Sequence, residues 1–148
     1  MVVLVDANVV IDFLTTREPF YEASSKVIKK CASEEIEGYI AIHSIPNLWY
    51  ILRKTSEEKR RKWMSDICEF LRVEGISHED VVKAIGMTDF KDFEDCLQDR
   101  CAEGIGADYI ITRNAKDFAG SAVPAVSPEE FLEAISGKSA SDNPVTKL

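Results

Sequence analysis

The first residues of the chain change their hydrophobic period at an acidic residue. Residues 2–5 form an unbroken apolar run that stops at Asp6, and apolar residues then recur at helical spacing as far as Leu14. An apolar run without polar alternation is typical of a strand that is covered on both faces, as in the parallel sheet of an α/β domain. The pattern therefore predicts a buried strand that leads into a short helix, with Asp6 at the carboxyl end of the strand.

Strand-like and helix-like patterns continue to alternate along the chain. The predicted helices cover residues 7–14, 20–35, 44–52, 57–71, 77–85, 92–103 and 129–135, and the predicted strands cover residues 2–5, 39–42, 72–76, 108–112 and 123–126. Ser44 is expected to cap the helix at whose start it stands. This order predicts an α/β fold, a three-layer α/β/α sandwich around a central, mostly parallel sheet of about five strands.

The length of 148 residues is sufficient for a single domain with a continuous core. This domain is expected to cover residues 1–136. Residues 137–148 are mainly polar, with little to bury, and are expected to form a disordered tail.

The formal net charge of −8 argues against wholesale electrostatic attachment to nucleic acid or to an anionic membrane. Partners with basic segments suit this charge better. The basic cluster at residues 59–62 is typical of a solvated helix face, and the alternative is a contact with RNA.

The cysteines give no sign of a metal or disulfide framework. Cys31, Cys68, Cys96 and Cys101 contain no Cys-x-x-Cys pair, and the chain has only two histidines, so a structural zinc site is not expected. The sequence shows no signal peptide and no apolar run long enough to cross a bilayer. It therefore predicts a cytoplasmic protein with reduced thiols and no membrane association.

Acidic residues recur at three places along the predicted fold. Asp6 follows the first strand, Asp92, Asp95 and Asp99 share one face of a helix, and the segment 114–117 follows a later strand. Because the carboxyl ends of parallel strands meet at one edge of a sheet, these groups are expected to converge there. Carboxylates without histidines or thiolates suit Mg²⁺ or Mn²⁺, and the corresponding chemistry is metal-assisted hydrolysis of a phosphodiester. The alternative is that Asp6 and Asp92 merely cap helices.

Four segments carry a resemblance to a known family: Val5–Asp12, Ser44–Leu52, Asp92–Leu97 and Ile111–Phe118. In this order and spacing the chain resembles the PIN domains, and more narrowly the small single-domain members that include VapC-type toxin ribonucleases. The resemblance covers residues 2–135. It implies an endoribonuclease that depends on Mg²⁺ or Mn²⁺, acts on an RNA substrate as the toxin of a toxin-antitoxin pair, and has an antitoxin protein and a second copy of itself as partners.

The resemblance also implies the residues of the site. Asp6, Asp95 and the acid of the Thr-Arg-x loop would hold the metal, with Asp92 as an added ligand. The sequence departs from the commonest pattern at Asn47, where many relatives have a ligand Glu, and at Asn114, where many have Asp. The expected catalytic and metal-binding residues are Asp6, Asp92, Asp95 and Asp117, the last in place of the acid missing at 114.

Six further residues are expected around the substrate, namely Asn8, Asn47, Thr112, Arg113, Asn114 and Lys116. Of these, Arg113 and Lys116 would contact the phosphate backbone of RNA, which dominates nucleic-acid affinity. Asn8 and Thr112 would orient the metal ligands.

Two alternatives to a nuclease remain open. The first is a catalytically weak or inactive PIN-like module that binds RNA or a protein, and it rests on Asn47 and Asn114. The second is a phosphatase of the haloacid dehalogenase type, which also begins with an Asp after a strand but requires Asp-x-Asp, whereas the second position here is Asn8.

Overall fold

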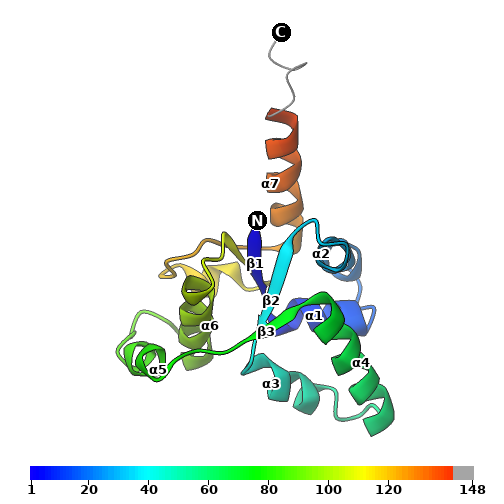
Figure 1. The fold of residues 1–148 in the computed structure, drawn as a ribbon, viewed down its shortest axis with the longest axis horizontal. Coiled ribbons are helices and arrows are strands. Elements are labelled where there is room, and N and C mark those ends of the chain that lie inside the picture. Colours follow the sequence, from blue (N-terminus) through cyan, green and yellow to red (C-terminus); the bar gives the residue numbers. More distant parts are fainter. Residues whose placement is uncertain (142–148) are drawn as a thin grey trace.

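The computed structural model describes residues 1–141, with side chains up to residue 137. Its centre is one sheet of five parallel strands in the order β3-β2-β1-β4-β5 (Figure 1). The strands are β1 Val2–Val5, β2 Glu37–Ala41, β3 Arg72–Glu74, β4 Tyr109–Ile111 and β5 Ala125–Val126. The predicted α/β/α sandwich with a five-stranded sheet is confirmed.

Helices connect the strands, as parallel pairing requires. They are α1 Ala7–Leu14, α2 Tyr21–Ala32, α3 Ser44–Ile51, α4 Glu57–Phe70, α5 His78–Ile85, α6 Phe93–Gly104 and α7 Pro128–Ser141, with a short 3₁₀ helix η1 at Ala115–Phe118. Figure 1 shows α5 and α6 on one side of the sheet and α2 and α4 on the other.

Alternate residues of the strands supply the two halves of the core. Val3 and Val5 of β1 pack with buried side chains of α1, α2, α4 and α7, whereas Leu4 packs with Cys101 and Ala102 of α6. Both faces of the sheet are therefore covered. This is why the sequence of β1 is a continuous apolar run.

The strand register brings the ends of β1 and β4 together. Val5 pairs with Ile111, and the next backbone amide, that of Asp6, donates to the carbonyl of Ile111 over 2.9 Å. Asp6 and Thr112 each follow directly after one of these strands. Their side chains therefore lie at one edge of the sheet, as expected for the carboxyl ends of parallel strands.

Two expectations about local structure differ from what is observed. Ser44 does not cap α3: the residue before it, His43, is already helical, and the hydroxyl oxygen of Ser44 is buried without a hydrogen-bond partner. The last helix, α7, continues past Ile135 to Ser141, so residues 137–141 of the expected tail are helical. Residues 142–148 lie outside the described part of the chain.

Further expectations concern thiols and membranes. All four cysteines are free, with Cys31, Cys96 and Cys101 buried and Cys68 exposed. Within residues 1–141, none of the helices is both long and apolar enough to cross a bilayer.

Candidate active site

An acidic cavity of about 510 Å³ opens at the carboxyl edge of the sheet. Its lining combines five carboxylates, three asparagines and one lysine with a few apolar groups. The lining residues are Asp6, Ala7, Asn8, Ile11, Asn47, Ile51, Lys91, Asp92, Phe93, Glu94, Asp95, Asn114 and Asp117. The four acids predicted from the sequence, Asp6, Asp92, Asp95 and Asp117, all line this one cavity.

Asp6 is held by four donors. Its Oδ1 accepts hydrogen bonds from the amide of Ala7 over 2.7 Å and from Nε2 of Gln98 over 3.1 Å. Its Oδ2 accepts from Oγ1 of Thr112 over 2.8 Å and from Nδ2 of Asn8 over 3.2 Å. Asp6 thus caps α1, as the alternative of a merely capping role expects. Three other side chains also hold it in the wall of the cavity.

Burial raises the pKa of Asp6, and the hydrogen bonds from Thr112, Ala7 and Gln98 act in the opposite direction. These donors favour the ionised form, because a charged carboxylate accepts hydrogen bonds more strongly than a neutral carboxyl group does. The hydrogen bonds therefore offset part of the effect of burial, and they fix the orientation of the carboxyl group.

Gln98 is a residue of the site that the sequence analysis missed. Its side chain is 1% exposed, and while Nε2 binds Asp6, Oε1 has no hydrogen-bond partner. A signal was present, since Gln98 lies three residues after Asp95 and therefore on nearly the same face of α6.

The start of helix α6 carries a group of carboxylates. Asp92 is the N-cap, and its Oδ1 accepts a hydrogen bond from the amide of Glu94 over 3.1 Å. The pKa of Asp95 is raised to about 7, by burial first and then by the neighbouring charges of Asp92, Asp6, Asp117 and Glu94. The carboxylates therefore lie close enough to repel one another.

Glu94 is a second acid that the sequence analysis missed. It lines the cavity, and its pKa is raised by burial first and then by the charges of Asp6 and Asp92. Its place next to Asp95 gave no periodic signal, because adjacent helical residues point about 100° apart.

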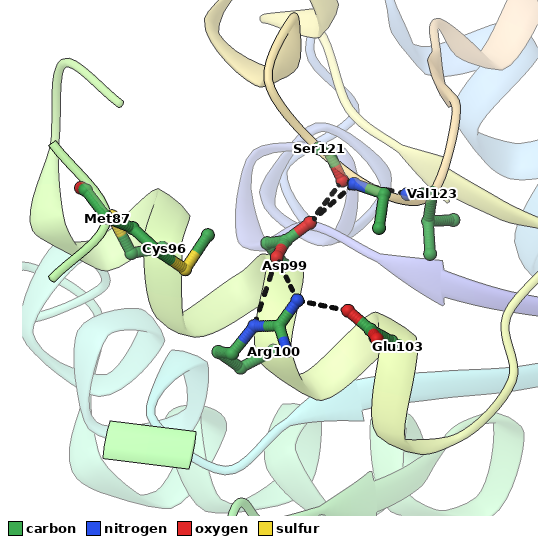
Figure 2. A network of polar contacts seen from close by, with 8 residues as sticks. Met87, Cys96, Asp99, Arg100, Glu103, Ser121 and Val123 are labelled. Atoms are coloured by element: carbon green, nitrogen blue, oxygen red, sulfur yellow. Dashed lines mark hydrogen bonds and ion pairs between the residues drawn. The ribbon is translucent and has the colours of Figure 1, made fainter. Parts of the chain in front are cut away.

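Asp99, on the same predicted face as Asp92 and Asp95, has a different role. Figure 2 shows its carboxylate between the guanidinium of Arg100 and the loop at Ser121. Oδ2 lies 2.7 Å from Nη2 of Arg100, and Oδ1 accepts from Oγ of Ser121 over 2.5 Å and from the amide of Ala122 over 3.0 Å. Asp99 is 1% exposed, so it ties α6 to the loop before β5 and does not line the cavity.

The loop after β4 contributes Asn114 and Asp117 to the cavity. The amide of Asn114 donates to Oγ1 of Thr112 over 3.1 Å, which places the two residues in one turn. Thr112 itself is fully buried, so it acts on Asp6 and cannot reach a substrate. Lys116 lines a neighbouring cavity that also includes Asp117.

Arg113, in the same turn, is not among the residues that line the cavity, although its charge acts on Asp6. Its Nε is 2.6 Å from Oδ2 of Asp12, an ion pair that does not have hydrogen-bond geometry, and its guanidinium lies 4.5 Å from the ring centroid of Phe20. Asp12 is fully buried. Burial raises the pKa of Asp12, while the charges of Arg113 and Arg17 lower it. Arg113 thus forms a structural ion pair with Asp12, and its expected contact with the phosphate backbone of RNA stays a prediction.

The donor set of the cavity fits a hard divalent cation in its chemistry. Carboxylate and amide oxygens are the ligands that Mg²⁺ and Mn²⁺ prefer, and mutual repulsion among acids is relieved by a cation. Within the described residues, no group of three or more His, Cys, Asp or Glu side chains is arranged as a complete metal site. Mg²⁺ needs no such cage, because proteins commonly hold it by one or two carboxylates together with water and substrate phosphates.

Comparisons with known proteins bear on the fold and the family. A family model described as "PIN domain" matches residues 2–116. The comparison with curated proteins found no match.

Solved structures of similar fold include three from bacteria. VapBC2 from Rickettsia felis, bound to a DNA fragment from its promoter, has a TM-score of 0.64 at 14% identity, over 86% of this chain and 98% of that one. A toxin-antitoxin complex from Klebsiella pneumoniae has a TM-score of 0.64 at 21% identity, over 85% and 97%. VapC20 from Mycobacterium tuberculosis, described as a sarcin-ricin loop cleaving toxin, has a TM-score of 0.58 at 14% identity, over 73% and 86%.

Proposed function

The chain belongs to the PIN domain family, and from this premise we propose that it is an endoribonuclease that depends on Mg²⁺ or Mn²⁺. The observation that carries the proposal is the convergence of Asp6, Asp92, Asp95 and Asp117 on one cavity. These acids come from the end of β1, from the start of α6 and from η1. A purely capping role would not require them to meet.

Asp6 and Asp95 are the proposed ligands of the ion, with Asp92 and Asp117 as further donors at the same cavity. When bound, a divalent ion activates water and neutralises the charge that builds up on the phosphate. Thr112, Gln98 and Asn8 hold Asp6 in place through their hydrogen bonds. Such outer partners normally fix the orientation of a ligand and tune its basicity.

Asn47 and Asn114 line the cavity from opposite elements, α3 and the loop after β4. Each amide offers both an oxygen to a cation and N–H donors to a phosphate. As neutral groups they also limit the repulsion among the five carboxylates. We assign them to the substrate side of the site, with Asp117 taking the place of an acid at 114.

A second candidate function is a PIN-like module that binds RNA or a protein with little or no cleavage. It is favoured by the two neutral residues, Asn47 and Asn114, which line the cavity. It shares the fold and the cavity with the nuclease. Only the chemistry separates the two.

An antitoxin partner and a homodimer are the assemblies we propose. The fold is shared with VapBC2 and with a toxin-antitoxin complex, in which a partner protein is present. An acidic cavity and a net charge of −8 suit a partner that inserts basic side chains. Co-purification of a small protein when the neighbouring gene is co-expressed, and the mass of the purified chain in solution, test these two assemblies.

Cleavage of mixed RNAs by the purified protein in Mn²⁺, in Mg²⁺ and in EDTA tests the nuclease. We expect cleavage that EDTA abolishes. Asp6→Asn and Asp95→Asn should each reduce it by more than the about 10- to 100-fold that is typical of losing an outer partner of a metal site. Glu133→Gln, an exposed acid on α7, is the matched control and should cleave normally. Cleavage that survives both substitutions, or that persists in EDTA, would overturn the proposal.

A further inference from the structure

Asp99 is a buried acid of α6 to which the proposed function assigns no role. Both oxygens of its carboxylate have partners (Figure 2). Oδ1 accepts hydrogen bonds from the hydroxyl of Ser121 and from the amide of Ala122, and Oδ2 is paired with the guanidinium of Arg100. Asp99 is 1% exposed and Arg100 is 6% exposed. Asp99 therefore binds the loop through charge-assisted hydrogen bonds in a dry place, where they are stronger than bonds between neutral groups.

The loop that Asp99 binds is continuous with one wall of the acidic cavity. Residues 112–124 connect β4 to β5 and include η1, whose Asp117 lines the cavity. Phe118 of η1 is buried in the half of the core that α6 covers, and Ser121 follows three residues later. We call the contact of Asp99 with this loop the Asp99 tether. It fixes the segment that directly follows η1.

The two walls that the Asp99 tether joins repel each other. The start of α6 contributes Asp92, Glu94 and Asp95 to the cavity, and η1 contributes Asp117. The charge of Asp117 is among those that disfavour the ionised form of Asp95. In the metal-free protein this repulsion acts to move η1 away from α6. The tether lies one helical turn after Asp95 and opposes that movement.

We propose that Asp99 is a positioning residue, which holds η1 against α6 and so sets the separation between Asp117 and Asp95 at which a divalent ion binds. The inference rests on the proposed function only for the ion, because the chain alone forms the tether. A carboxylate at this position accepts hydrogen bonds from both sides. The amide of an asparagine accepts on one side only, so its NH₂ group would face a donor, either Arg100 or the amide of Ala122.

Hydrogen–deuterium exchange of the metal-free protein tests the tether without an ion. Asp99→Asn should speed the exchange of amides in residues 114–122 by about tenfold, the ratio that corresponds to losing one charge-assisted hydrogen bond. Ser121→Ala removes one of the two loop contacts and keeps the ion pair with Arg100, so it should have a smaller effect on the same segment. Glu103→Gln is the matched control, because Glu103 pairs with the same arginine from a half-exposed position on α6.

Asp117→Asn separates positioning from a purely structural role. Because the tether opposes repulsion, adding Asp117→Asn to Asp99→Asn should slow the exchange again. In isothermal titration, Asp99→Asn should bind Mn²⁺ about tenfold more weakly than wild type, and Glu103→Gln should bind it equally. When Asp117→Asn is already present, Asp99→Asn should weaken binding by less than about twofold further, because the tether acts through Asp117.

The possible outcomes distinguish the tether from the metal site. Unchanged exchange in Asp99→Asn would overturn the inference, and so would faster exchange that Asp117→Asn does not reverse. Equal Mn²⁺ affinity of wild type and Asp99→Asn would refute the positioning role and leave the proposed metal site intact. Exchange as predicted without Mn²⁺ binding by wild type would refute the proposed function and, with it, the role of Asp99 toward an ion. If melting curves show that Asp99→Asn does not fold, Ser121→Ala undergoes the same tests, with the same signs expected.

Discussion

The side-chain amide of Gln98 donates a hydrogen bond of 3.1 Å to Oδ1 of Asp6, and so joins α6 to the end of β1 across 92 positions of the chain. The hydroxyl of Thr112 reaches the other oxygen of the same carboxylate over 2.8 Å. Asp6 is therefore oriented from two sides. The two donors differ, because the hydroxyl oxygen of Thr112 itself accepts hydrogen bonds from the amide of Asn114 and from Nδ2 of Asn8, whereas Gln98 carries a buried carbonyl oxygen without a partner.

This difference predicts an order of stability effects. Thr112→Val keeps the shape but removes a donor to a charged group, and should lower the free energy of unfolding by about 2 kcal/mol. Gln98→Met removes a donor too, but it also removes the unpartnered carbonyl, and should cost only about 1 kcal/mol. Urea unfolding of both variants measures the difference.

Thr15→Val is the matched control for the threonine. The hydroxyl of Thr15 donates to the carbonyl of Ile11 at an exposed site, so its loss should cost well under 1 kcal/mol. If Thr112→Val and Thr15→Val lowered the free energy of unfolding equally, the hydrogen bond from Thr112 to Asp6 would add nothing beyond an exposed one, and this would contradict the prediction.

Much of this arrangement follows from the sequence, and the physical reason is periodicity. The unbroken run Val2–Val5 and the helical spacing of the later segments predict a parallel sheet, and a parallel sheet brings Asp6 and the loop after β4 to one edge. The convergence of Asp6, Asp92, Asp95 and Asp117 was predictable for that reason.

The features that could not be predicted depend on the direction of individual side chains and on partners that are distant in the sequence. Asp99 shares a helical arc with Asp95, yet it binds Arg100 and Ser121, because a difference of about 40° around the helix is enough to face another loop. The motif of Arg113 indicates a phosphate contact. Its ion pair with Asp12, which lies 101 residues earlier, cannot be predicted from local sequence patterns. Gln98 was missed because an amide carries no charge signal.

The pair of Arg113 and Asp12 gives a second prediction. Arg113→Leu removes the ion-pair partner of a fully buried carboxylate, and should lower the free energy of unfolding by about 3 kcal/mol. The double variant Asp12→Leu/Arg113→Leu should recover much of that loss, since no buried charge remains. Denaturant unfolding of the two proteins makes the comparison. Unchanged stability in Arg113→Leu would instead point to a free arginine available for RNA.

Asp95 gives a third prediction, in the dependence of stability on pH. Its pKa rises from 3.8 in the unfolded chain to about 7 in the folded one, so between these values the folded protein binds the extra proton. The free energy of unfolding of the metal-free protein must therefore fall as the pH rises through this window. Asp95→Asn removes the effect and should melt higher than wild type at pH about 7.5, by about 3 °C for each kcal/mol gained.

Melting curves of the metal-free wild type and Asp95→Asn across this pH range measure the effect, with Glu133→Gln as the exposed control. If Asp95→Asn melted at or below the temperature of wild type at every pH, this would contradict the claim that the carboxylates of the cavity repel one another.

The thiols give a fourth prediction. Burial raises the pKa of Cys31 to about 12 and that of Cys101 to about 11, and it also raises the pKa of Cys96. Cys68 is exposed. Because the thiolate is the reactive form, a disulfide reagent should modify one thiol in the native protein and all four in denaturant. Mass spectrometry that finds the fast-reacting thiol anywhere except at Cys68 would contradict the packing described.

The central claim, that the converging acids hold a divalent ion, is tested most directly by isothermal titration of the purified protein with Mn²⁺. It needs neither the correct RNA nor any turnover. Wild type and the control Glu133→Gln should bind Mn²⁺ equally, and Asp95→Asn should bind at least about tenfold more weakly. Asn114→Asp adds a carboxylate to the cavity lining and should bind more tightly than wild type. An affinity for Mn²⁺ that is the same in wild type and Asp95→Asn, or no binding by wild type at all, would contradict the account.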